Sequence, residues 1–220
     1  MRIEILGPPG SGKTSIAESL SEKLELPYVS LGNITRREVE LNTEIGKKMK
    51  VYLNRNIFYP PGFLLPIIKE HLGQKECING FILDGYPKLA HEVDELTSIL
   101  NDLGIKLDIV LILRVPIEKA LERISGRLYC YNCHKHYHEI DHPPRVPGIC
   151  EKCGRELKRR KDDSPEIIKE RFADFEKELP EVAGRLRRAA DKVIEIDATL
   201  SLEDIINRII TVLVNDKNRK

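Results

Sequence analysis

The sequence predicts an α/β fold in which a parallel sheet is flanked by helices. Short apolar segments rich in β-branched residues alternate along the chain with segments that have helical periodicity, which is typical of such a sheet. The first apolar segment runs into a glycine-rich loop, and a helical pattern follows the loop directly. With 220 residues, of which 41% are hydrophobic and 32% charged, the chain suits one α/β core with small inserts.

Five strands are expected, at residues 2–6, 27–30, 80–83, 109–113 and 193–196. The first strand stops at a glycine-proline cluster, and apolar residues then recur at helical spacing from Ile16 to Leu24. Each later strand is separated from the next by sequence with a helical pattern. Ligands of such sheets bind at the carboxyl ends of the strands, so we expect the functional site at that edge.

Two stretches fit the core poorly and are interpreted as inserts that hang over the strand ends. Residues 31–60 are polar and helical without a strand, and residues 127–161 are crowded with Cys, His, Pro and Arg. The core is then formed by residues 1–30, 61–126 and 162–220. Inserts at the strand ends are where mobile lids are usually found.

Composition excludes several classes of protein. The 36 Lys and Arg residues nearly balance the 35 Asp and Glu residues, which removes the general argument for a nucleic-acid binder but leaves room for a local basic patch. No apolar stretch approaches the roughly 20 residues of a membrane helix. The N-terminus shows no charged-then-apolar leader, so we expect a cytoplasmic protein that is independent of membranes.

A phosphate-binding motif occupies residues 7–14, Gly-Pro-Pro-Gly-Ser-Gly-Lys-Thr, which fit G-x-x-x-x-G-K-[ST] between a strand and a helix. The glycines permit a tight turn whose backbone N–H groups surround a phosphate, and the helix adds its positive end. The motif predicts a P-loop NTPase-type core whose ATP-binding residues here are Gly10, Ser11, Gly12, Lys13, Thr14 and Ser15. It indicates a nucleotide site and leaves the reaction open.

Further motifs follow in order: Ser-Leu-Gly-Asn at 30–33 leading to Arg36, Asn-Gly-Phe-Ile-Leu-Asp-Gly-Tyr-Pro-Lys at 79–88, Arg-Ile-Ser-Gly-Arg at 123–127, and Arg-Lys-Asp-Asp at 160–163. With them the chain resembles the adenylate kinases of the nucleoside monophosphate kinase family, in the form that carries a metal-binding lid. The resemblance runs from Gly7 to about Arg171.

The resemblance implies reversible transfer of the terminal phosphoryl group from Mg-ATP to a nucleoside monophosphate, with AMP as the leading acceptor and a monomer as the expected state. It also implies a catalytic set of Lys13, Asp84, Arg123, Arg127, Arg160 and Arg171, of which Arg123 and Arg127 also hold ATP. The acceptor residues it implies are Leu31, Gly32, Arg36, Gly85, Lys88, Glu92, Arg160 and Arg171. Phosphoryl transfer to an ionised phosphate needs positioning and positive charge rather than a strong base, which agrees with so many cations.

Asp84 ends an apolar strand and is therefore expected at the sheet edge beside the phosphate loop. There its carboxylate, with the Thr14 hydroxyl, can hold Mg²⁺ directly or through water. The alternative is a cap on the following turn.

Four positions depart from the family pattern, and all lie on the acceptor side. Leu31 and Asn33 replace Thr and Asp, Lys88 replaces Arg, and Glu92 replaces a Gln that resembles a base reader. A carboxylate only accepts hydrogen bonds, which suits guanine better than adenine and also tolerates the amino group of cytosine. The acceptor is thus AMP, or a relaxed choice that includes GMP or CMP; a solvated Glu92, with backbone near Gly85 reading adenine, keeps AMP.

The pairs Cys130/Cys133 and Cys150/Cys153 have the spacing of two knuckles that close a tetrahedral thiolate site for structural Zn²⁺. Spacing alone also fits iron. The histidines between the knuckles are expected on the polar surface. Two rival functions remain: an RNA-linked regulatory ATPase that uses the basic zinc segment, and a degenerate family member that only binds nucleotide.

Overall fold

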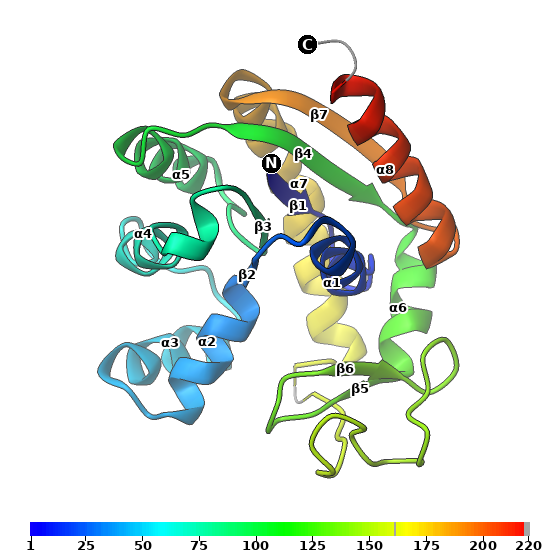
Figure 1. Ribbon diagram of the computed structural model, residues 1–220. Coiled ribbons are helices and arrows are strands. Elements are labelled where there is room, and N and C mark those ends of the chain that lie inside the picture. The colour runs from blue at the N-terminus through cyan, green and yellow to red at the C-terminus, as the bar shows by residue number, and fades with distance from the viewer. Residues whose placement is uncertain (161, 218–220) are drawn as a thin grey trace.

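The computed structural model describes residues 1–160 and 162–217, and the side chains as far as residue 213. Lys161, at the end of the predicted lid, and the last three residues lie outside the described part. A five-stranded parallel sheet forms the centre, in the order β2-β3-β1-β4-β7 (Figure 1). Its strands are β1 (Arg2–Leu6), β2 (Tyr28–Ser30), β3 (Phe81–Asp84), β4 (Leu107–Arg114) and β7 (Ala190–Asp197).

All five predicted strands are confirmed, and two are longer than expected. The strand predicted at 109–113 extends to Leu107–Arg114, and the one predicted at 193–196 extends to Ala190–Asp197. These two strands pair over most of their length, from Leu107 opposite Ala190 to Arg114 opposite Asp197. The added positions include polar residues, which the hydropathy pattern alone excludes from a strand and which backbone pairing keeps in it.

Helices cover both faces of the sheet because its strands are apolar on both sides. Ile3 and Ile5 of β1 lie in the cluster formed with α1 (Lys13–Leu24), α6 (Ile117–Ser125) and α8 (Leu202–Lys217). Leu6 of the same strand lies in the opposite cluster, with α4 (Leu65–Leu72), α5 (Ala90–Asp102) and α7 (Pro165–Ala189). Alternate residues of one strand thus serve two cores, as the parallel arrangement requires.

The first predicted insert is helical, as expected, with α2 (Leu31–Glu40) and α3 (Glu44–Arg55). Ser30 and Thr43 begin these helices, and each accepts a hydrogen bond from the backbone N–H three residues later. Gly46 lets the two helices pack closely, because a Cβ built there would lie 2.0 Å from the carbonyl oxygen of Glu38.

The second predicted insert contains a small sheet, which the sequence interpretation missed. Strands β5 (Arg127–Tyr129) and β6 (His136–His138) pair antiparallel, with Leu128 opposite Tyr137. Figure 1 places this hairpin below the core, beside the carboxyl end of α6 and across from α2. Its own small cluster contains Cys130, Tyr137, Cys150 and Leu157, so the segment is organised around the cysteines.

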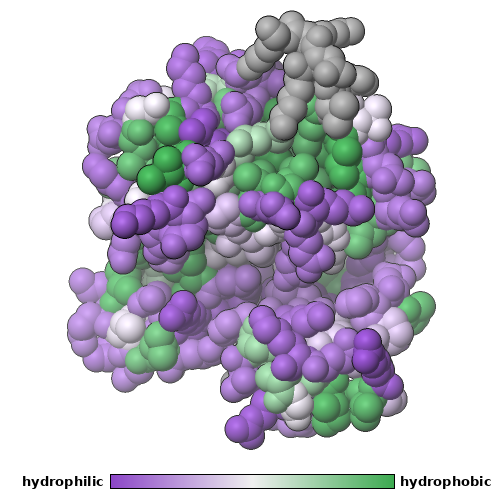
Figure 2. All heavy atoms as spheres, in the orientation of Figure 1, coloured by the Kyte–Doolittle hydropathy of each residue, from purple (hydrophilic) through white to green (hydrophobic). Residues whose placement is uncertain are grey.

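Among the described residues, no helix combines the length and apolar character that crossing a membrane demands. Hydrophilic residues cover most of the face seen in Figure 2, and hydrophobic residues gather on it in separate patches. Two exposed apolar side chains, Ile140 and Val146, belong to the loop between β6 and the second cysteine pair.

Candidate functional site

The phosphate loop joins the carboxyl end of β1 to α1 and adopts the tight turn that its glycines predict. Gly10 and Gly12 have φ angles of 78° and 86°, a backbone region that favours glycine. A Cβ at Gly10 would also lie 2.5 Å from the carbonyl oxygen of Ala120 on α6. The loop is therefore shaped by backbone conformation and by its contact with a neighbouring helix.

Lys13 folds back over this loop. Its ammonium group donates to the carbonyl oxygens of Gly7 and, at 2.9 Å, of Pro8. Desolvation lowers the pKa of Lys13 to about 8, Asp84 opposes the shift, and the positive charges of Lys88, Arg127 and Arg171 add to it. Four charged groups from other segments thus act on Lys13 at the sheet edge.

Asp84 lies at that edge, beside Ile5 of β1 and Ser30 of β2 in the sheet register. Its carboxylate is nearly buried and accepts a hydrogen bond of 2.8 Å from the Tyr28 hydroxyl. The same hydroxyl interacts with Thr14 of the phosphate loop. Asp84 and Thr14 therefore sit around one tyrosine, and their carboxylate and hydroxyl oxygens are donors that suit a hard cation such as Mg²⁺.

On the acceptor side, the Arg36 side chain folds back towards the first turn of its own helix, α2. Its guanidinium donates to the Asn33 side chain at 2.7 Å, and it passes 3.1 Å from the position that a Cβ on Gly32 would take. Gly85, with φ 84°, lies against Leu31 and Gly32. Leu31 itself is buried. The structure thus brings together four of the residues that the resemblance places around the acceptor.

Glu92, the expected base reader, is engaged within the protein through one of its two carboxylate oxygens. It is buried, and its Oε2 atom accepts the backbone N–H groups of Lys88 at 2.6 Å and of Leu89 at 3.1 Å. Burial raises the pKa of Glu92, while these hydrogen bonds lower it. This oxygen therefore caps the start of α5, and the alternative of a solvated residue is wrong, while base reading by Glu92 stays a prediction.

The four arginines of the predicted catalytic set come from three segments. Arg123 on α6 reaches towards the phosphate loop, with its NH1 atom 4.0 Å from the position of a Cβ on Gly12. Arg127 makes a two-point ion pair with Asp163, in which its Nε lies 2.8 Å from a carboxylate oxygen. Arg171 on α7 pairs with Asp162 at 3.0 Å.

Arg160 has a different environment, because its neighbours are aromatic. Its guanidinium carbon lies 4.5 Å from the ring centroid of Tyr129, and its NH2 atom lies 3.0 Å from both ring nitrogens of His136. Desolvation lowers the pKa of Arg160 to about 9, and repulsion from Arg36 and Arg127 adds to this. Positive charge is therefore concentrated here beyond what nearby carboxylates balance, which suits an anionic ligand.

The four cysteines of the two knuckles converge. Their sulfur atoms all lie within 4.8 Å of one another, with 3.4 Å between Cys130 and Cys153 and between Cys133 and Cys150. Four thiolates at Zn–S distances of about 2.3 Å require sulfur separations of nearly this size. The residues therefore fit a closed tetrahedral metal site, although spacing does not choose the metal.

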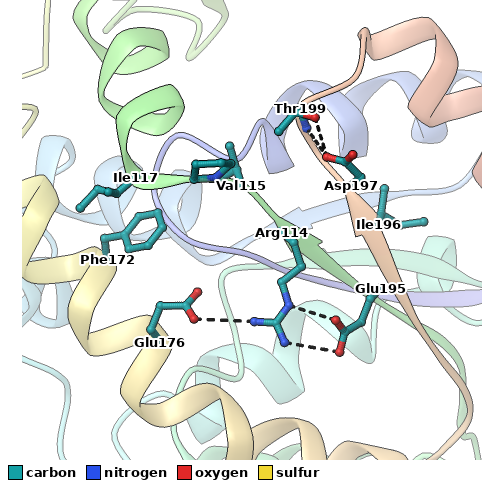
Figure 3. Close-up of a pocket in the computed structure, with 10 residues that line it drawn as sticks. Arg114, Val115, Ile117, Phe172, Glu176, Glu195, Ile196, Asp197 and Thr199 are labelled. Atoms are coloured by element: carbon teal, nitrogen blue, oxygen red, sulfur yellow. Dashed lines mark hydrogen bonds and ion pairs between the residues drawn. The ribbon is translucent and has the colours of Figure 1, made fainter.

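A surface pocket elsewhere on the sheet edge carries none of the predicted site residues among those that line it. It lies between the ends of β4 and β7 and the helices α6 and α7 (Figure 3). Arg114 crosses it and pairs with Glu195 at 3.1 Å and with Glu176 at 3.7 Å. The Arg114 charge is thus already balanced within the pocket, and the cation-rich region around Lys13 is the better candidate site.

Three residues of this region were missed by the sequence interpretation. Tyr28 and Tyr129 contact the predicted site residues, yet single tyrosines carry no signal in sequence. Glu4 is fully buried in β1, and Asp84, Lys13 and Glu92 all influence its pKa. A charged residue inside an apolar strand was the available signal for Glu4.

Each comparison of this chain with known proteins indicates the same family. A family described as adenylate kinase matches residues 5–191. An adenylate kinase of Caldicellulosiruptor bescii is 43% identical over 172 residues, which cover 78% of this chain and 80% of that protein. One of Desulforamulus reducens is 38% identical over 94% of this chain and 98% of its own length, and one of Clostridium beijerinckii is 36% identical over 99% and 100%.

Proposed function

The chain belongs to the adenylate kinase family and is a phosphotransferase that moves a phosphoryl group from ATP to AMP, and on that premise we propose how its residues divide this work. Gly10, Gly12 and Lys13 hold the ATP phosphates, Arg36 and Lys88 hold the acceptor phosphate, and the remaining arginines neutralise the phosphoryl group in transit. The proposal rests on one observation, that positively charged side chains from separate segments lie close enough to shift one another's pKa. Lys88, Arg127 and Arg171 act on Lys13, and Arg36 and Arg127 act on Arg160.

The acceptor oxygen is already ionised, so the site needs no strong base. It needs to bring two polyanions together in line and to spread the charge of the moving group. Arginine forks suit this role because each binds two phosphate oxygens at once. Lys13 adds a compact charge, and a phosphate beside it would favour its protonated form.

The residues on the acceptor side agree with AMP. Guanine offers two donors side by side, which a carboxylate can meet only with both oxygens, and one oxygen of Glu92 already accepts from the backbone at the start of α5. Leu31 offers an apolar surface on which a base can pack. Lys88 keeps the charge of the usual arginine but lacks the planar fork that binds two oxygens at once, which predicts weaker binding of the phosphate.

Two metal ions fit the residues present. Mg²⁺ accompanies ATP, and the Thr14 hydroxyl and the Asp84 carboxylate are the groups that would hold it, directly or through water. Zn²⁺ fits the four cysteines, fills its coordination sphere with sulfur and therefore has a structural role. We propose that residues 127–161 act as a lid and residues 31–60 as the acceptor insert, which together exclude water during transfer.

The decisive experiment measures ADP formation with and without AMP. We expect ADP to form only when a monophosphate is present, whereas a regulatory ATPase would release ADP from ATP alone. Lys13→Ala should lower kcat by about 10³-fold or more, because it removes a charge that acts on the transferred group. Wild-type kcat in that variant would contradict the assignment of Lys13.

A panel of AMP, GMP, CMP and UMP, assayed on the same preparation, tests the acceptor. We expect kcat/KM for AMP to exceed that for GMP by about a hundredfold, which corresponds to roughly 2.7 kcal/mol. Comparable values for AMP and GMP would replace AMP with a relaxed acceptor. Titration with RNA at several salt concentrations would expose the RNA-linked alternative.

A further inference from the structure

One tyrosine of the metal-binding segment contacts arginines from two distant parts of the chain. Tyr129 ends β5 and is fully buried. Its hydroxyl oxygen accepts a hydrogen bond of 3.0 Å from the Nε of Arg36, which lies 93 positions earlier on α2. Its ring centroid lies 5.2 Å from the guanidinium carbon of Arg36 and 4.5 Å from that of Arg160.

The same hydroxyl also takes part in a second contact between the two inserts. It lies 2.7 Å from the Nδ1 of His134, whose Nε2 lies 3.7 Å from the carboxylate of Glu40. Arg36 and Glu40 are four positions apart and therefore share one face of α2. If the hydroxyl accepts from Arg36 and donates to the Nδ1 of His134, the imidazole proton lies on Nε2, on the side that faces Glu40.

His134 has the left-handed backbone conformation of its knuckle turn. It occupies φ 61°, and its N–H donates to the carbonyl oxygen of Cys130 at 2.9 Å. In the second knuckle the corresponding residue, four positions after Cys150, is Gly154, with φ 70° and the same hydrogen bond at 2.8 Å. His134 thus has a left-handed backbone conformation at the position where the other knuckle has glycine. A residue other than glycine keeps this conformation where surrounding contacts hold it there.

An aromatic ring suits this position better than a carboxylate would. Arg36 and Arg160 repel each other, and a carboxylate between them would form ion pairs that compete with the phosphates of a substrate. A ring and a neutral hydroxyl attract both cations more weakly than a phosphate does. Tyr129 can therefore orient the two arginines and still release them to a ligand.

We infer that Tyr129 is a positioning residue that orients Arg36 and Arg160 and, with His134, joins the metal-binding segment to the acceptor-binding helix α2. The inference rests on the proposed function, since it takes Arg36 as an acceptor-phosphate ligand. Tyr129 does not touch the reacting atoms in this role. It reduces the freedom that Arg36 must lose when the monophosphate arrives.

Two substitutions separate the hydroxyl from the ring. Tyr129→Phe should raise the KM for AMP by about 3- to 10-fold and leave kcat and the KM for ATP nearly unchanged, because it removes the hydroxyl bonds to Arg36 and His134 and keeps the ring. Tyr129→Leu also removes the ring under Arg160 and should lower kcat/KM for AMP by about 5- to 30-fold further. Tyr131→Phe, in the same knuckle, is the matched control.

A double-mutant cycle distinguishes positioning from general damage. In an Arg36→Ala background, adding Tyr129→Phe should change the KM for AMP by less than about 1.5-fold, since the group it positions is gone. His134→Gly should raise the KM for AMP while zinc content and the melting temperature are retained. Zinc content and melting temperature are measured for every variant, so that a folding defect is recognised.

The inference is overturned if Tyr129→Phe binds AMP as the wild type does, or if it raises the KM by the same factor with and without Arg36. Calorimetric titration with AMP provides the same comparison without turnover. A wild-type protein that binds AMP but forms no ADP would refute the proposed chemistry alone. Equal AMP affinity in the wild type and Tyr129→Phe would refute the role of Tyr129 alone.

Discussion

Replacing Glu4 should make the protein more stable at neutral pH. This carboxyl lies in the middle of β1, is fully buried, and neither of its oxygen atoms has a hydrogen-bond partner among the described residues. Burial raises the pKa of Glu4 well above its usual range, and repulsion from Asp84 raises it further, while Lys13 lowers it. A buried polar group without a partner costs about 1–3 kcal/mol, so Glu4→Leu should raise the free energy of unfolding by about that amount at pH 7.

The pH dependence has a definite sign. Because the pKa of Glu4 is higher in the folded state than the value of about 4.3 in an unfolded chain, the folded state binds the proton more tightly. Its contribution to stability is complete below that unfolded value and is lost as the pH rises towards the folded one. In that window the loss approaches about 1.4 kcal/mol per pH unit.

Glu4→Gln is the matched control, because it has the same shape and does not titrate. Urea unfolding at pH 5, 6, 7 and 8 should show the wild type losing stability relative to Glu4→Gln with each step. Glu4→Leu should be the most stable of the three at pH 7, since it also removes the buried polar atoms. A wild-type value that keeps a constant difference from Glu4→Gln across this range, or a less stable Glu4→Leu, would refute the reasoning.

Three further outcomes are expected. Removing the metal with a chelator should lower the melting temperature by several degrees and loosen residues 127–161, as metal analysis and calorimetry would show, because the four cysteines hold a segment with a small core. Gly46→Ala should lower the free energy of unfolding in urea by about 1–3 kcal/mol, since a Cβ there meets the carbonyl of Glu38. Lys88→Arg should lower the KM for AMP by about 3- to 10-fold in a coupled assay, because the guanidinium fork binds two phosphate oxygens at once.

Alternation of apolar and helical segments was enough to predict the sheet and the helices around it. It was not enough for the hairpin of β5 and β6, whose strands are three residues long and consist largely of Arg, Tyr and His. These strands form because knuckle hydrogen bonds, such as that from the Cys130 N–H to Lys135 at 3.0 Å, bring the chain back on itself. A long-range sulfur cluster, rather than local propensity, specifies them.

Glu92 shows what a motif position leaves out. In sequence it stands where the family has a base reader, which indicates a ligand for the base. The N-cap residue of α5 is Leu89, which has no side-chain oxygen, so the usual capping signature is absent. Glu92, at the third position of the helix, accepts the backbone N–H groups of Lys88 and Leu89, and this role is visible only once the helix boundary is known.

The arrangement of charges gives a physical reason why substrate is needed to complete the site. Arg127 and Arg171 are held by Asp163 and Asp162, while Arg36 is held by neutral oxygens, those of Asn33 and Tyr129. On the proposed roles, a phosphate competes with a carboxylate for each arginine of the first pair, but only with neutral partners for Arg36. Acceptor binding at Arg36 therefore costs less than engagement of the ion-paired arginines, which a larger negative charge favours. An enzyme built in this way is poorly organised for transfer to water when only ATP is bound.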